Sequence, residues 1–89
     1  MSLKHLRQNI AKIDVQLVKL LNERARQSLQ IFMEKQRSNL PVYNQQREDQ
    51  VIQNVIQQNK GPLTSEQLKS IFEIIIESCR TIQQKQERL

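Results

Sequence analysis

The sequence contains very few of the residues that break helices or build special sites. Its 89 residues include one glycine, two prolines, one cysteine, one histidine and no tryptophan. The single cysteine, Cys79, excludes an intramolecular disulfide, and the single histidine, His5, leaves too few ligands for an ordinary zinc site. No apolar run is long enough to span a bilayer and no secretory signal opens the chain, so we expect a reducing, cytoplasmic location.

The residues that are abundant favour helices. Gln, Lys, Leu, Ile, Glu and Arg make up much of the chain, and no alternation typical of strands is present. We therefore expect an all-α fold in which residues 1–89 form a single domain. Lys and Arg total 14 against 9 acidic residues, a net charge of +5, which favours an anionic partner or substrate.

The spacing of apolar residues predicts three helices. The first runs from about Leu3 to about Arg37, the second opens at the N-cap Asn44 and ends before 59–62, and the third begins at Thr64. Gln67 follows Thr64 in the spacing of a capping box. The predicted apolar stripe of the third helix is Leu68, Ile71, Phe72, Ile75, Cys79 and Ile82.

The first helix is too long for its own chain to cover. At roughly 1.5 Å per residue it measures about 50 Å, whereas a compact fold of this size has a radius of gyration of about 12 Å. A second copy of the chain is the simplest cover, so we expect a homodimer. The stripe that such a partner would cover consists of Leu3, Leu6, Ile10, Ile13, Leu17 and Leu20.

Cations interrupt this stripe further along. The next position is Arg24, and Lys35 follows about three turns later in nearly the same direction. A guanidinium and an ammonium inside a helical core are costly to desolvate unless an anion meets them. The alternative is that the stripe drifts around the helix, because 3.6 residues per turn do not divide seven, and that Arg24 is an ordinary surface residue.

Other polar residues lie in line with apolar stripes, and the distances along the first helix indicate which of its cations can share one ligand. Arg47 and Glu48 precede the apolar face of the second helix (Val51, Ile52, Val55 and Ile56), and Gln83 follows Cys79 by four residues. Arg24 and Lys35 are about 16 Å apart along the axis, near enough to share a small ligand. Arg7 is about 25 Å from Arg24, so it can reach such a ligand only from a partner chain. Spacing alone favours a solvated Arg7 over a functional one, and it favours Cys79 as a small buried hydrophobe.

The order of these residues resembles the all-helical (AroQ, type II) chorismate mutase family. The resemblance covers about Leu3 to Gln83 and rests on an ordered set rather than on one motif. Its members are Leu6-Arg7, Ile10, Ile13-Asp14, Leu17, Leu20-Leu21, Asn22-Glu23-Arg24, Lys35, Pro41-Val42, Arg47-Glu48, Gly61-Pro62-Leu63, Ile71-Phe72 and Gln83.

The resemblance implies an intertwined homodimer that converts chorismate to prephenate in aromatic amino acid biosynthesis, with no cofactor or metal. It implies that Arg24 and Arg7 of the partner subunit clamp the substrate carboxylates. Lys35 and Gln83 would donate hydrogen bonds to the ether oxygen. The remaining implied contacts are Glu48, which accepts from the substrate hydroxyl, and Arg47, Asn44 and Cys79, which bind substrate.

Two of these positions depart from the family pattern. Asn44 stands where the enteric bacterial form has an acid, and Cys79 where it has a serine. Asn44 can still accept a hydrogen bond, whereas a thiol is a weak donor. Phe32 and Met33 are also larger than expected beside Lys35, which predicts a bulky approach to the site.

Three alternatives remain open at this point. Isochorismate-pyruvate lyases share the helical scaffold and a similar cationic pocket. A basic helical module that binds nucleic acid or a partner helix is a further possibility, although no helix-turn-helix spacing supports it. Mutase domains of this class also resemble those fused to other enzymes of the same pathway, so both a free-standing enzyme and a fused domain fit the sequence.

Overall fold

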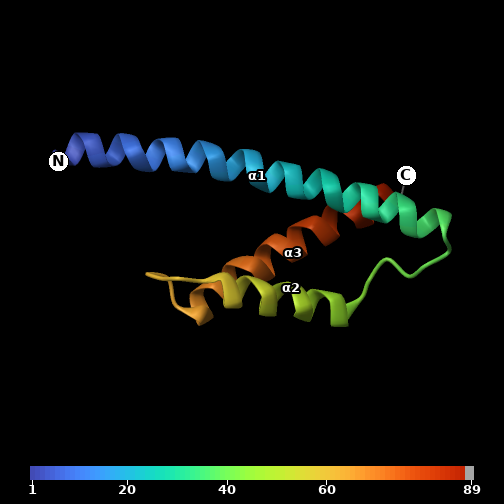
Figure 1. The fold of residues 1–89 in the computed structure, drawn as a ribbon. Helices are drawn as coiled ribbons and strands as arrows, with labels where there is room; N and C mark the ends of the chain where they lie inside the picture. Colours follow the sequence, from blue (N-terminus) through green and yellow to red (C-terminus); the bar gives the residue numbers. More distant parts are fainter. Residues whose placement is uncertain (88–89) are drawn as a thin grey trace.

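Three helices make up the fold of the described residues, 1–87, in a computed structural model. Helix α1 spans Leu3–Arg37, α2 spans Gln45–Gln58 and α3 spans Ser65–Glu87. Helix α3 contacts both of the others: α2 runs alongside α3, and the C-terminal half of α3 crosses behind the C-terminal half of α1 in the view of Figure 1. The all-α class and the predicted ranges of the three helices are confirmed.

Side chains cap the start of each helix, as the sequence predicts for α2 and α3. The Ser2 hydroxyl accepts from the backbone N–H of His5 at 3.1 Å, and Asn44 Oδ1 accepts from the backbone N–H of Arg47 at 3.1 Å. Thr64 and Gln67 bond reciprocally, each backbone N–H donating to the other's side chain at 3.0 and 3.1 Å. These bonds satisfy backbone donors that have no partner inside the helix.

The end of α1 turns the chain back toward the helix it leaves. Asn39 adopts a left-handed conformation with φ 57°, which asparagine tolerates better than most residues. The backbone N–H of Leu40 then donates to the Lys35 carbonyl at 2.8 Å. The following segment returns past the last turn of α1, so that the Val42 carbonyl lies within reach of the Lys35 side chain.

The core is small and lies where α1 meets α3. The buried apolar side chains among the described residues are Phe32, Ile76 and Cys79. The predicted stripe of α3 is therefore partly wrong: it omitted Ile76 and included Ile71 and Ile82, which remain exposed. The reason is that α3 packs along the four-residue row Leu68, Phe72, Ile76, so its buried face is rotated from the predicted one.

The N-terminal half of α1 projects beyond the other two helices (Figure 1). Its apolar stripe is open to solvent in the single chain, with Ile10 58% and Leu20 60% exposed. The radius of gyration is 16.2 Å, against about 12 Å for a compact chain of this length. The prediction that the chain cannot cover its own first helix is confirmed. No helix within residues 1–87 is both long enough and apolar enough to cross a membrane, and the cytoplasmic location stays a prediction.

Candidate active site

A cavity of about 140 Å³ lies between the C-terminal half of α1, the start of α2 and the end of α3. Seven of the predicted site residues line it: Arg24, Lys35, Asn44, Arg47, Glu48, Cys79 and Gln83. The rest of the lining is formed by Ser28, Val42, Val51, Ile76 and Arg80. Residues that are up to 59 positions apart in sequence, Arg24 and Gln83, thus share one cavity.

Arg24 is held against α3 without being neutralised. Its Nη1 donates to Cys79 Sγ at 3.2 Å, and the Cys79 side chain is buried. A thiol sulfur is a weak acceptor, so this contact orients the guanidinium while leaving its charge uncompensated. Cys79 is buried, as the sequence predicts, and its sulfur accepts a hydrogen bond from the Arg24 guanidinium.

Lys35 is anchored by the loop that follows its helix. Its Nζ donates to the Val42 carbonyl at 3.0 Å, and the side chain is half-buried. An ammonium group carries three N–H donors, so two remain available to the cavity. The backbone turn at Asn39 is what brings the Val42 carbonyl to this position.

Gln83 joins the end of α3 to α1. Its Nε2 donates to the Ser28 carbonyl at 2.8 Å across 55 residues of sequence. That bond sets which end of the amide is the NH₂ group and uses one of its two N–H donors. The second N–H and the amide oxygen are available to a ligand.

Glu48 has a partner that the sequence analysis missed. Arg80 Nη2 donates to Glu48 Oε1 in a half-buried ion pair. The hydrogen bond to Glu48 raises the pKa of the Arg80 guanidinium further above its ordinary value. A signal for Arg80 was present, because it continues the four-residue row of Phe72 and Ile76 just as Arg24 continues the stripe of α1.

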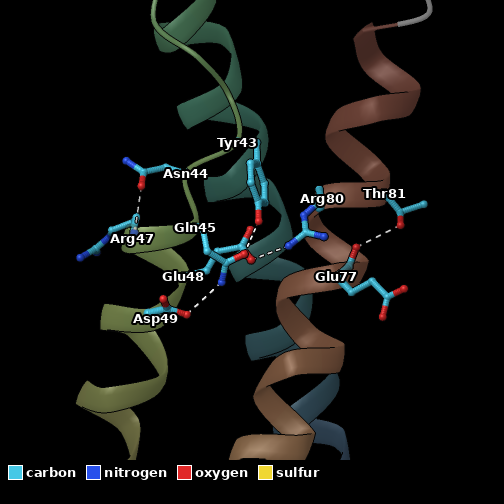
Figure 2. A network of polar contacts seen from close by, with 9 residues as sticks. All are labelled: Tyr43, Asn44, Gln45, Arg47, Glu48, Asp49, Glu77, Arg80 and Thr81. Atoms are coloured by element: carbon cyan, nitrogen blue, oxygen red, sulfur yellow. Dashed lines mark hydrogen bonds and ion pairs between the residues drawn. The ribbon is translucent and has the colours of Figure 1, made fainter.

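Asn44 and Arg47 lie at the exposed edge of the cavity. Asn44 Oδ1 is engaged by the N-terminus of α2, so its cap role competes with the predicted acceptance of a substrate hydrogen bond. The Arg47 guanidinium reaches only Gln50, at 3.4 Å, and is otherwise exposed. Figure 2 shows both side chains on the side of α2 away from α3.

Phe32 and Met33 do not crowd the approach to Lys35, contrary to the sequence expectation. Phe32 is 2% exposed and packs in the core, whereas Met33 is exposed, and neither lines the cavity. Met33 lies two residues before Lys35, about 160° around the helix, so its side chain points away from the cavity. Phe32 lies one turn before Lys35 on a neighbouring row, but its side chain is buried in the core.

Arg7 is the predicted site residue that its own chain does not bring to the cavity. It lies in the projecting half of α1 and is exposed, beside Leu3, Lys4 and Ala11. Seventeen helical residues, about 25 Å, separate it from Arg24. The helix is continuous over that span, so no break shortens the distance.

The cavity carries a strong excess of positive charge. Among the described residues, four cations, Arg24, Lys35, Arg47 and Arg80, line the cavity with one carboxylate, so the formal charge of this lining is +3. Within residues 1–87 the ion pairs are Arg80 with Glu48 and Arg37 with Glu34, which leaves three of the four cations without an acidic partner there. No three His, Cys, Asp or Glu side chains in the same range lie close enough together to hold a metal ion. Such a lining is suited to a small dianion.

Two solved structures share this fold over nearly their whole length. Chorismate mutase form II from Thermus thermophilus superposes with a TM-score of 0.89, is 24% identical, and matches 93% of this chain and 94% of its own. Form I of the same protein gives a TM-score of 0.83 at 25% identity, over 85% of this chain and 95% of its own.

Sequence relatives agree with the structural ones. The bifunctional chorismate mutase/prephenate dehydratases of Aquifex aeolicus and Pseudomonas aeruginosa are 34% and 36% identical over 87 residues, 93% and 92% of this chain. The chain spans only 24% of the length of each. A sequence model of the family described as chorismate mutase type II matches residues 6–84. The resemblance found in the residues is confirmed, and the chain belongs to the chorismate mutase type II family.

Proposed function

We propose that this chain isomerises chorismate to prephenate, for aromatic amino acid biosynthesis. The observation that carries the proposal is the charge of the cavity: in a chain of this family, three cations without acidic partners in the described residues face one small space. The substrate is a dicarboxylate, which supplies the two negative charges that such a lining needs.

The reaction requires the protein to fix the conformation of the substrate and to stabilise charge, and it requires no nucleophile. In this intramolecular rearrangement one C–O bond breaks while a C–C bond forms, with no group transferred to the protein. The protein must hold the flexible substrate in its folded, reactive shape. It must also meet the negative charge that grows on the ether oxygen as the C–O bond breaks.

Arg24 is assigned to one substrate carboxylate. Its guanidinium is oriented by Cys79 and keeps the remaining N–H donors for a bidentate contact. Arg47, at the open edge, adds a second cation on the path by which an anion enters. Arg7 of the partner subunit is assigned to the other carboxylate.

Lys35 and Gln83 are assigned to the ether oxygen. Each has one donor occupied by a backbone carbonyl, Val42 or Ser28, and each has at least one donor left. Side chains fixed in this way need little rearrangement when charge develops, which is the condition for stabilising a transition state more than the bound substrate. Glu48 keeps its second carboxylate oxygen available to accept from the substrate hydroxyl.

The position of Arg7 and the uncovered half of α1 support a homodimer as part of this proposal. The exposed stripe of Leu3, Leu6, Ile10, Ile13, Leu17 and Leu20 needs a cover. A second copy packed along it around a two-fold axis buries the same stripe of both chains. It also carries Arg7 toward the partner's cavity, so that two equivalent sites form.

The test is to supply purified protein with chorismate and with isochorismate in parallel and to identify the products. We expect prephenate from chorismate as the dominant reaction. Salicylate and pyruvate from isochorismate, without prephenate, would contradict the proposal and assign the lyase activity. No turnover of either substrate, together with a salt-dependent affinity for duplex DNA, would instead indicate a nucleic-acid-binding module.

A further inference from the structure

Arg80 and Glu48 lie at the boundary between three neighbouring cavities. Both residues line the active-site cavity, a second hollow between α2 and α3, and a third beside Tyr43. Their ion pair is therefore a wall of the active site rather than a feature of the outer surface. The side chains are 34% and 21% exposed, which leaves the pair less screened than a surface pair.

The Arg80 guanidinium is held on more than one side. One Nη donates to Glu48, the guanidinium carbon lies 5.0 Å from the centre of the Tyr43 ring, and Nε is buried without a hydrogen-bond partner. Figure 2 shows the ring of Tyr43 beside the guanidinium, and a dashed line joins the guanidinium to the Glu48 carboxylate on the α2 side. A planar cation stacked on an aromatic ring keeps a defined orientation.

The charges in the cavity show why Glu48 needs such a partner. Within residues 1–87 it is the only carboxylate that lines this cavity, and Lys35 and Arg47 line the same cavity without an acidic partner in that range. If Glu48 were not held by Arg80, its carboxylate would be attracted to one of these cations. An ion pair of that kind would neutralise the group assigned to the substrate.

We propose that Arg80 is a positioning residue that holds the Glu48 carboxylate against α3, so that Lys35 and Arg47 stay free for the substrate. The ring of Tyr43 supports the Arg80 guanidinium in this role. This inference rests on the proposed mutase activity and extends it to residues outside the predicted site. Arg80 acts through Glu48 and does not touch the substrate. The competing possibility, direct contact of Arg80 with a substrate carboxylate, is separated by the experiment below.

The experiment is a double-mutant cycle on turnover of chorismate by the Arg80→Met, Glu48→Gln and combined variants. For Arg80→Met we expect kcat to fall by about 10- to 100-fold, because the released carboxylate pairs with Lys35 or Arg47. The neutral amide that Glu48→Gln introduces attracts neither cation, so the combined variant should be no less active than Arg80→Met alone. Arg80→Lys keeps the charge and should retain more activity than Arg80→Met.

Arg37→Met is the matched control, because Arg37 forms an exposed ion pair with Glu34 at 3.5 Å and does not line the cavity. It should leave turnover unchanged. If Arg80→Met fails to fold, Tyr43→Ala replaces it. Loss of the ring beside the Arg80 guanidinium should lower kcat by about threefold, and Tyr43→Phe, which keeps the ring, should retain more activity. In a protein that already carries Glu48→Gln, Tyr43→Ala should cause no further loss.

Two results would overturn the positioning role. One is unchanged turnover in Arg80→Met, and the other is losses that multiply in the combined variant, which would assign Arg80 to the substrate itself. A wild-type protein that leaves chorismate untouched would contradict the proposed function instead, and that assay comes first.

Discussion

Replacing Lys35 by alanine is expected to lower kcat for chorismate by about 100- to 1,000-fold, or about 2.7–4 kcal/mol of transition-state stabilisation. The reason is that Lys35 is the cation assigned to the ether oxygen, and its Nζ is already anchored on the Val42 carbonyl. KM should change much less than kcat, because the charge on that oxygen develops only as the bond breaks. Steady-state rates of prephenate formation give both constants.

Lys60→Ala is the control for this substitution. Lys60 is an exposed lysine in the loop between α2 and α3, and it lines none of the cavity. Circular dichroism should show the same helix content for both variants, because Lys35 is not part of the buried core. A folded Lys35→Ala protein with kcat within about threefold of the wild type would remove Lys35 from the mechanism.

Changing Gln83 to glutamate should make the reaction dependent on pH. The wild-type amide does not titrate, so we expect a fairly flat activity across neutral pH. An ionised carboxylate at position 83 would face the growing negative charge and repel it, and activity near neutral pH should fall by about 100-fold or more. It should rise again as the pH is lowered and the acid is protonated.

The bond from Gln83 to Ser28 limits that recovery. A protonated carboxyl group has one O–H to donate, whereas the amide has two N–H donors and uses one on the Ser28 carbonyl. The variant should therefore stay below the wild type even at its best pH. Gln86→Glu, the same charge change at an exposed position on α3, is the control and should keep the flat profile. Equal activity of Gln83→Glu in acidic and in alkaline buffer would contradict the role of the amide.

The helices were predictable because their signals are local. The Asn44 cap, the Thr64–Gln67 capping box and the residues 59–62 that end α2 all act within one turn. The face that α3 buries was harder to predict, because it depends on how α3 packs against two helices at once. Ile76 is buried and Ile71 exposed for that reason.

The site was predictable where a polar residue interrupts an apolar stripe. Arg24 and Lys35 stood out in this way and line the cavity. Arg80 was missed because the predicted stripe passed through Cys79 and Ile82, which put Arg80 to one side. The partners of Gln83 and Lys35 are backbone carbonyls, and no sequence pattern marks which carbonyl a side chain will reach. The whole apolar stripe of α1 can be identified in the sequence, but in the single chain the other two helices leave its N-terminal half exposed.

We propose that each active site is built from two copies of the chain, and this can be tested directly. Arg7→Ala and Lys35→Ala should each be nearly inactive alone, since each breaks both sites of a homodimer. In a mixed dimer, one site would contain both substitutions and the other would contain neither. The mixed dimer would therefore keep one intact site.

The measurement is chorismate turnover by the two variants co-expressed at equal levels, with sedimentation analysis to establish that the protein is dimeric. Random pairing makes half of the dimers mixed, each with one intact site of two, so we expect about a quarter of the wild-type activity. Activity no higher than that of the separate variants, in a protein shown to be dimeric, would contradict a site shared between two chains.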